Sequence, residues 1–258
     1  MTDGASVAPT PLLTFILRQG DRSLVLAQRL LEYITHAPEI EEDMALSNIA
    51  LDLIGQARVL YSYAGEFEGL GHDEDHFAFQ RDADEFLSPV LVERPNEDFA
   101  HVIVRQFLHD AYAVPHWTHL AESSDATLAA LGAKAAKEAA YHLRHSSAWV
   151  VRLGDGTEES HRRVTVALEH LWPCTEELFE VDEIDAELFS AGVSPDPSAI
   201  RTSWDTTVDR VLTEATLPRP EPPVPAVTGG LSGLHEDDFE RLITVMQELA
   251  RTHPGAEW

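Results

Sequence analysis

The residues best placed for chemistry are Asp110 and His142, a carboxylate and an imidazole that fall on the inner faces of two predicted helices. These are the ligand types of di-iron helical bundles, in which two helices supply a carboxylate each and two others supply Glu-x-x-His. The segment Leu53-Ile54-Gly55-Gln56 has the spacing of such a motif but carries Leu and Gln at the ligand positions. The chain therefore either rebuilds a metal site from other residues or has lost one.

The helices that position these residues are predicted from apolar side chains spaced alternately by three and four residues. This spacing predicts long helices over 11–36, 39–68, 97–122 and from 126 to about 153. The stripe of the second helix consists of Leu46, Ile49, Leu53, Gln56, Leu60 and Tyr63. A long connection over 69–95, with one short helix near 77–86, allows a crossover. Together these features predict an all-α, ferritin-like four-helix bundle.

Additional C-terminal helices are predicted after the bundle. A fifth helix extends to about residue 179, two more cover 198–215 and 236–251, and a Pro- and Gly-rich irregular arm lies near 217–234. Residues 1–10 are predicted to be a flexible tail, so that residues 11–258 form a single ferritin-like helical domain. Gly20-Asp21 predicts a kink in the first helix with Asp21 as a cap, and Asn96 is predicted to cap the third helix.

Few polar residues occupy the inner stripes. The first helix offers Gln19 and Ser23, the second Gln56, and the third Gln106 and Asp110; the fourth offers His142, with Ala139 three residues before it. One carboxylate and one imidazole cannot hold two irons, so we expect neither a metal site nor a catalytic residue in this chain. Because an inward carboxylate needs a partner, we predict that Asp110 and His142 pair with each other. A weak single-metal site made by these two residues is the alternative.

Other titratable residues receive structural interpretations. His116, His119 and His145 are predicted to lie on the surface, because none has a Cys or Glu companion in motif spacing. Glu138 points off its stripe and is predicted to be exposed or in an interface. Acidic residues at the start of the second helix interact favourably with the helix dipole, and this interaction explains them without any further role. They are Glu39, Glu41, Glu42 and Asp43.

The composition of the chain excludes several classes of binding partner and cellular location. The chain has 258 residues, 44% of them hydrophobic, and a net charge of −27 from 18 basic and 45 acidic residues. This charge argues against nucleic acid or an anionic membrane as a partner. No apolar run is long enough to span a membrane, the first ten residues lack a secretory signal, and Cys174 is the single cysteine. A cytoplasmic location is therefore expected.

Four motifs occur in order along the chain, HAPEIEED at 36–43, NIALDLIGQAR at 48–58, KEAAYHLR at 137–144 and PGAEW at 254–258. Together they resemble the C-subunit family of bacterial phenylacetyl-CoA epoxidases, the ring 1,2-phenylacetyl-CoA monooxygenases of phenylacetate catabolism. The resemblance extends from about residue 12 to the C-terminus. It implies a ferritin-like fold and a paralogous catalytic A subunit that holds the di-iron centre.

The resemblance also identifies the positions where ligands have been replaced. The catalytic subunit has Glu-x-Gly-His where this chain has Leu53-Ile54-Gly55-Gln56, and Glu-x-x-His where it has Ala139-Ala140-Tyr141-His142. Ser23 stands in place of a first-helix Glu, whereas Asp110 matches the remaining carboxylate. The ligand-equivalent positions are thus Ser23, Leu53, Gln56, Asp110, Ala139 and His142.

These departures imply a structural, non-catalytic subunit of a multicomponent phenylacetyl-CoA 1,2-epoxidase, which supports the di-iron A subunit in aerobic phenylacetate degradation. A small B subunit and a reductase that uses NADPH, flavin and iron–sulfur groups are the other implied partners; a homodimer of the isolated chain is left open. No cofactor is expected on this chain itself. Two alternatives remain. One is a metal-dependent oxidoreductase with a rearranged site that recruits Asp110 and His142 together with Asp52 or Glu138, and the other is an acidic scaffold bundle unrelated to oxygenation.

Overall fold

The computed structural model describes residues 10–221 and 225–256, and all regular structure in these residues is helical. The longer helices are α1 (Pro11–Glu32), α2 (Ile40–Glu68), α5 (Phe99–Leu120), α6 (Ala126–Gly154), α7 (Glu158–Leu171), α9 (Pro197–Glu214) and α10 (Asp237–Thr252). The shorter helices and 3₁₀ turns are α3 (Glu74–Phe79), η1 (Ala83–Glu85), α4 (Val90–Glu93), η2 (Trp172–Cys174), η3 (Glu176–Phe179), α8 (Glu183–Ser190) and η4 (Gly230–Ser232). Within the described residues, no helix combines the length and apolar character needed to cross a lipid bilayer.

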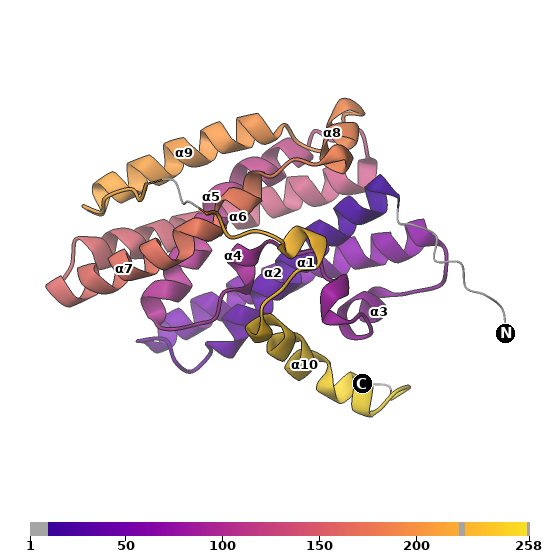
Figure 1. Ribbon diagram of the computed structural model, residues 1–258, viewed down its shortest axis with the longest axis horizontal. Helices are drawn as coiled ribbons and strands as arrows, with labels where there is room; N and C mark the ends of the chain where they lie inside the picture. The colour runs from indigo at the N-terminus through magenta and orange to yellow at the C-terminus, as the bar shows by residue number, and fades with distance from the viewer. Residues whose placement is uncertain (1–9, 222–224, 257–258) are drawn as a thin grey trace.

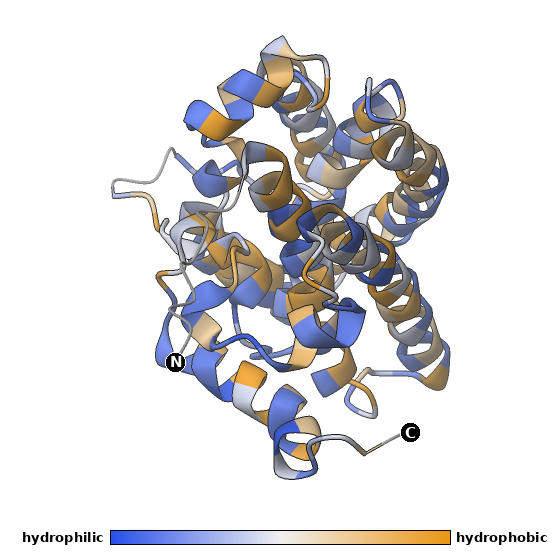
Figure 2. Ribbon diagram, turned by 90° about the vertical axis from the view of Figure 1, so that its right-hand side faces the viewer, coloured by the Kyte–Doolittle hydropathy of each residue, from blue (hydrophilic) through white to orange (hydrophobic). Residues whose placement is uncertain are grey.

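Two helical hairpins form the bundle. Helix α1 packs along α2, and α5 packs along α6, while the crossover between α2 and α5 contains α3, η1 and α4. Helices α7 and α9 pack against α5 on one side of the molecule, and α10 packs against α3 and η1 on the opposite side (Figure 1). Hydrophilic and hydrophobic residues alternate along each ribbon, as in amphipathic helices (Figure 2). The predicted all-α, ferritin-like bundle with additional C-terminal helices is confirmed.

The prediction of the C-terminal helices differs from the structure in two places, one helix end and one additional helix. The fifth helix ends at Leu171 and is followed by the two 3₁₀ turns η2 and η3. Pro173 lies in this region, and because proline has no backbone N–H it cannot continue the hydrogen-bond pattern of an α-helix. Helix α8 was not predicted; it begins at Glu183, and its N-cap Asp182 accepts hydrogen bonds from the backbone N–H groups of Ile184 and Asp185 at 2.9 and 3.0 Å.

The predicted cap of the third bundle helix was wrong by two residues. Asp98, not Asn96, caps α5, and its Oδ1 accepts a hydrogen bond from the backbone N–H of His101 at 3.0 Å. Asn96 instead donates from Nδ2 to the backbone oxygen of Arg29 at 2.7 Å, and its Oδ1 accepts from Arg105 Nη2 at 2.8 Å. Both residue types can cap a helix, and only the tertiary contacts of Asn96 distinguish them here.

Helix α1 continues without a break through Gly20 and Asp21, so no second helix starts at Asp21. Gly20 allows α2 to approach closely, since a Cβ atom at this position would lie 2.6 Å from Cε1 of Tyr61. Asp21 does not cap a helix. Its side chain is completely buried and contacts the crossover segment.

Asp21 is the centre of a buried polar cluster that joins α1, α2 and the crossover. Tyr61 donates its hydroxyl proton to Asp21 Oδ1 at 2.5 Å, Arg81 Nη1 donates to Oδ2 at 3.1 Å, and the backbone N–H of Leu87 donates to Oδ2 at 2.7 Å. Burial, and then the Asp21 carboxylate, raise the pKa of Tyr61 well above its usual range, so the phenol stays protonated and donates. A buried carboxylate is tolerated only when its oxygens are satisfied in this way.

A second buried carboxylate holds the irregular arm near 217–234. Glu177 accepts hydrogen bonds from the backbone N–H groups of Val90, Gly229 and Leu231 at 2.6, 2.7 and 3.1 Å. Burial raises the pKa of Glu177, and these three N–H groups oppose that effect. Residues 222–224 of the arm and residues 1–9 of the predicted tail lie outside the described residues.

The C-terminal helices complete the hydrophobic core. One apolar cluster fills the space around α1 and α2 and includes Phe239 of α10, whereas a second joins α5 to α7 and α9. Trp204 of α9 is 1% exposed, and its indole N–H donates to the backbone oxygen of Leu108 at 3.0 Å. Helices α7, α9 and α10 are therefore built into the core.

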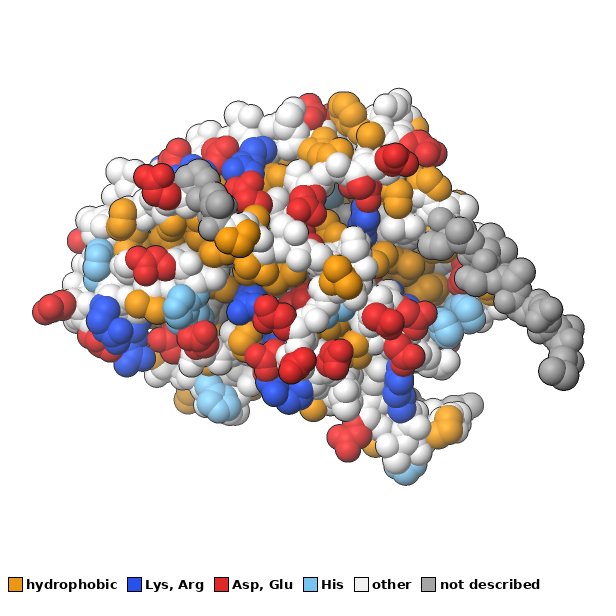
Figure 3. All heavy atoms as spheres, viewed as in Figure 1, with side chains coloured by type: hydrophobic (Ala, Val, Ile, Leu, Met, Phe, Trp, Pro, Cys, Tyr) orange, Lys and Arg blue, Asp and Glu red, His pale blue; other side chains and the backbone are white. Residues whose placement is uncertain are grey.

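Acidic side chains lie at many places on the face seen in Figure 3, among basic, hydrophobic and other groups. Many basic residues lie close to them as exposed ion pairs. Arg162, for example, pairs with Glu159 at 2.9 Å, and both side chains are more than half exposed. Exposed pairs of this kind contribute little to stability, unlike the buried Asp21 cluster.

Replacing Arg81 by Met tests whether the Asp21 cluster stabilises the fold. The change leaves a buried carboxylate without its ionic partner, and we expect the free energy of unfolding to fall by about 3–5 kcal/mol. Urea unfolding followed by circular dichroism measures the change. Arg162→Met, at the exposed pair, is the control and should leave the midpoint unchanged. Equal midpoints for the two variants would contradict the assigned role.

Candidate functional site

The six ligand-equivalent positions come from all four bundle helices. Their side chains are at most 2% exposed, so each faces the interior of the protein; they are Ser23, Leu53, Gln56, Asp110, Ala139 and His142. The four polar residues among them all have partners within the protein. These partners determine whether the bundle centre can hold a metal.

Asp110 is satisfied by side chains of α5 and α6. Gln106 Nε2 donates to its Oδ1 at 2.7 Å, and Ser146 Oγ donates to its Oδ2 at 2.8 Å. His109 Nδ1 lies 3.4 Å from the same Oδ1. Burial lowers the pKa of His109 against the opposing effect of the Asp110 carboxylate, so its imidazole stays neutral at pH 7. Both oxygens of Asp110 are thus occupied by uncharged donors.

The predicted pair between Asp110 and His142 is wrong. His142 Nε2 instead contacts Asp52 Oδ2 at 3.0 Å, across the α2–α6 interface. Asp52 precedes Leu53 by one residue and was predicted to point away from the inner stripe. It lies at the edge of the stripe, with its side chain 41% exposed, and there it reaches the imidazole from the partner helix. Residues beside an inner stripe are close enough to contribute side chains to it.

Glu138 was predicted to be exposed or in an interface, and it forms a hydrogen bond to a buried side chain of the bundle interior. Gln56 Nε2 donates to Glu138 Oε2 at 3.1 Å, and Lys134 Nζ lies 2.9 Å from Glu138 Oε1. The Glu138 side chain is 16% exposed. It therefore connects a buried amide at the bundle centre to an exposed ammonium group.

Two of the three histidines predicted to lie on the surface have defined partners. His116 is 2% exposed, and its Nδ1 lies 3.3 Å from the hydroxyl of Tyr112. His145 Nε2 contacts Glu42 Oε2 at 2.8 Å, so one of the acidic residues at the start of α2 also has a partner. His119 is half-buried. The surface prediction was wrong for His116 because this face of α5, outside its inner stripe, lies against the η3 region and the start of α9.

The donor set at the bundle centre does not fit a di-iron centre. Leu53 and Ala139 offer no ligand atom, and Asp110 and His142 are directed to separate partners. Among residues 10–221 and 225–256, no three His, Cys, Asp or Glu side chains converge at the bundle centre. We therefore derive no reaction step through a metal at this position.

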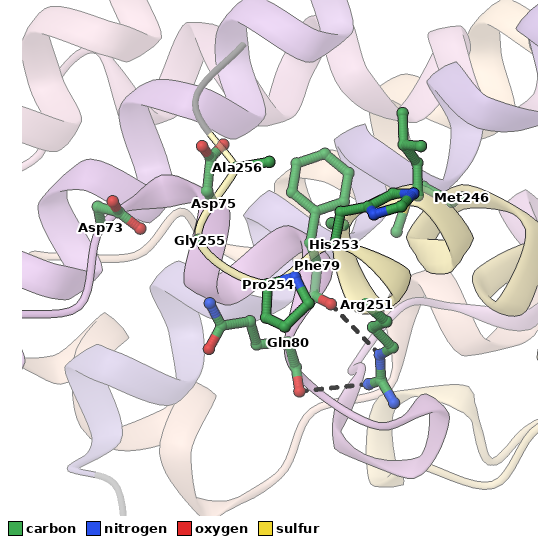
Figure 4. A pocket seen from close by; sticks show the side chains of 12 residues that line it. Asp73, Asp75, Phe79, Gln80, Met246, Arg251, His253, Pro254, Gly255 and Ala256 are labelled. Carbon is green, nitrogen blue, oxygen red and sulfur yellow. Dashed lines mark hydrogen bonds between the residues drawn. The ribbon is translucent and has the colours of Figure 1, made fainter.

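A surface cavity of about 760 Å³ lies between α3 and α10, away from the bundle centre. It is lined by Phe79 and Gln80 of the α3 region, by Arg251, and by residues 253–256. Arg251 fixes one wall, since Nε donates to the backbone oxygen of Phe79 at 3.4 Å and Nη2 to that of Gln80 at 3.2 Å (Figure 4). None of the ligand-equivalent residues lines this cavity.

Comparison with known proteins agrees with the sequence motifs. The family model described as phenylacetic acid catabolic protein matches residues 2–258. A curated relative, the C subunit of 1,2-phenylacetyl-CoA epoxidase from Escherichia coli (strain K12), is 48% identical over 247 residues, which cover 96% of this chain and 99% of the relative. The resemblance inferred from the motifs is confirmed.

Restoring the ligand types tests the inward orientation of these positions. Leu53→Glu combined with Gln56→His and Ala139→Glu buries two additional carboxylates, and we expect the metal-free variant to lose several kcal/mol of stability. Thermal melting in the presence of a chelator measures this loss. The matched control, Leu51→Glu with Ala140→Glu, adds the same carboxylates at exposed positions of the same helices. Melting temperatures that are equal in the two variants would contradict the inward orientation.

The buried His116 should make the fold sensitive to acid. Burial, and then the positive charge of Arg22, lower the pKa of His116 well below its usual value. As the pH falls below about 6.5, the unfolded chain takes up a proton that the folded chain does not, so the free energy of unfolding decreases.

We expect His116→Gln to lose less stability than the wild type between neutral and mildly acidic pH. Urea unfolding at several pH values measures this dependence. His253→Gln, at an exposed position, is the control and should leave it unchanged. The same pH dependence in His116→Gln and the wild type would show that His116 does not contribute.

Proposed function

The chain belongs to the phenylacetic acid catabolic protein family, and from this membership we propose that it is the structural, non-catalytic subunit of a multicomponent phenylacetyl-CoA 1,2-epoxidase. In this role it holds a paralogous di-iron catalytic subunit in its active form during aerobic phenylacetate degradation. The relative from Escherichia coli is named as the C subunit, and the similarity covers nearly the whole length of both chains. This similarity supports assignment to an epoxidase complex. A further small subunit and an NADPH-dependent reductase with flavin and iron–sulfur groups complete the proposed assembly.

The observation that carries this proposal is the chemistry of the bundle centre. An empty cage of carboxylates would leave like charges facing one another in a medium that cannot screen them. Here Leu53 and Ala139 are apolar and buried, and the one fully buried carboxylate of the set, Asp110, is hydrogen-bonded on both oxygens. The centre is thus suited to maintaining the shape of the bundle in the absence of a metal.

The outer face of α2 offers a contact surface for the catalytic subunit. Large apolar side chains follow one face of this helix, opposite the inner stripe; they are Ile40, Met44, Leu51 and Val59, with exposures of 75%, 61%, 62% and 42%. Gly55 lies between Leu51 and Val59, and a Cβ atom added there would have no neighbour within 4 Å. Exposed apolar patches of this kind are typical of protein–protein contacts. The net charge of −27 favours a partner with basic residues around that contact.

A metal-dependent oxidoreductase with a rearranged site is the second candidate. The observation that favours it is the position of Asp52 and Glu138, which reach His142 and Gln56 from the edge of the bundle. Carboxylate and imidazole groups at such distances are able to bind a metal after a change of rotamer. The two candidates differ in one measurable quantity, the iron content of the isolated chain.

Purification from iron-rich medium distinguishes them. We expect the isolated chain to contain far less than one iron, and a complex with the catalytic subunit to contain iron and to oxidise the ring of phenylacetyl-CoA. Two irons in each isolated chain would support the second candidate. A catalytic subunit that is equally soluble and active without this chain would overturn the proposed structural role.

The contact surface is tested with the same complex. Leu51→Glu should weaken co-purification with the catalytic subunit by at least about tenfold, because it places a charge in an apolar contact. Val245→Glu, at a 65% exposed position of α10, is the matched control and should leave co-purification unchanged. Equal recovery with both variants would exclude the outer face of α2 as the contact.

A further inference from the structure

A cluster of metal-ligating side chains lies away from the bundle centre, where α7 meets the start of α5. It consists of Glu97, His101 and His170, whose ligand atoms all lie within 4.8 Å of one another. Glu97 lies just before Asp98, the N-cap of α5, and His101 lies in the first turn of that helix, whereas His170 comes from the last turn of α7. The packing of α7 on α5 brings the two histidines together.

The distances within this cluster match those of a tetrahedral metal site. Ligand atoms placed about 2.0–2.1 Å from a zinc ion at tetrahedral angles are about 3.3 Å apart. His101 Nε2 lies 3.3 Å from His170 Nδ1 and 3.3 Å from Glu97 Oε2. His170 Nδ1 lies 3.8 Å from Glu97 Oε1. Small rotations of the exposed Glu97 side chain are enough to bring all three atoms onto one ion.

A second carboxylate orients the buried histidine of the cluster. His101 is 6% exposed, and its Nδ1 lies 2.8 Å from Asp98 Oδ1. When Nδ1 donates its proton to Asp98, the lone pair of Nε2 faces Glu97 and His170. A carboxylate in this position is the usual outer partner of a metal-binding histidine, because it fixes the tautomer and the ring orientation.

The surroundings leave one coordination position open to water. The side chains of Glu97 and His170 are each 55% exposed. The nearby cation Arg163 is directed elsewhere, to Asp98 Oδ2 at 3.5 Å and Glu159 Oε1 at 2.7 Å. Two imidazoles, one carboxylate and one water suit a divalent transition metal of the zinc class better than Mg²⁺ or Ca²⁺, which prefer oxygen ligands.

We propose that Glu97, His101 and His170 bind one divalent ion of the zinc class and thereby connect the end of α7 to the start of α5. The ion is separate from the di-iron chemistry of the proposed complex, and its binding does not depend on the proposed function. Without an ion, His170 Nδ1–H is able to donate to His101 Nε2, so the cluster has a stable metal-free form.

Titration of the tag-free full chain with Co²⁺, after treatment with a chelator, tests this site. We expect one equivalent to bind with the visible absorption of a tetrahedral cobalt complex, and Zn²⁺ to displace it. His170→Gln and Glu97→Gln change exposed side chains and should each weaken binding by at least tenfold. Their unchanged circular dichroism would show that the fold is preserved.

A second histidine pair in the chain provides the matched control. The rings of His72 and His76 stack with centroids 3.6 Å apart, and His72 Nδ1 is already bonded to Glu68 at 2.8 Å. His76→Gln should therefore leave cobalt binding unchanged. Loss of binding in His76→Gln but not in His170→Gln would overturn the proposal, as would binding only at millimolar metal with no tetrahedral absorption.

Discussion

The cost of removing a charge from water determines how the interior of this bundle is built. A buried carboxylate is tolerated when protein donors satisfy its oxygens, and it is strongly destabilising otherwise. Asp21, Asp110 and Glu177 are buried carboxylates that meet this condition, and each accepts hydrogen bonds from at least two parts of the chain. Elsewhere at the centre the chain avoids the cost altogether, with the apolar residues Leu53 and Ala139 at positions that the resemblance equates with glutamate ligands.

These buried carboxylates also explain how the irregular segments are held. The crossover is joined to α1 and α2 through Asp21, and the arm near 217–234 is joined to the crossover through Glu177. Irregular backbone has N–H groups that helices cannot satisfy, and a buried carboxylate accepts several of them at once. The same hydrogen bonds thus satisfy both the buried carboxylate and the backbone N–H groups. For this reason, segments without regular structure are able to lie next to the core.

The sequence predicts the helices well, because the periodicity of apolar residues is a local signal. It identifies the inner face of α2 through Leu53 and Gln56, both of which are buried. It does not identify the partners of polar residues. Asp21 and Arg81, for example, are 60 residues apart in the sequence. Asp52 contacts His142 from a position beside the inner stripe, where the sequence pattern predicts that the side chain points away. His116 was misplaced because α5 has more than one buried face. His170 has no local signal for its proximity to His101, since only the packing of α7 on α5 brings them together.

Helix α2 shows how the inner and outer faces of the bundle are separated. Leu53 belongs to the inner face and Leu51 to the outer face, and they are exposed to 2% and 62%. In a di-iron bundle the inner face depends on the metal, since ligand charges are neutralised only when the ions are present. With Leu53 and Ala139 in the core, the inner face depends on apolar packing and hydrogen bonds alone. It follows that the geometry of the outer face does not depend on iron, so the proposed contact with a catalytic subunit does not require that subunit to have acquired its iron first.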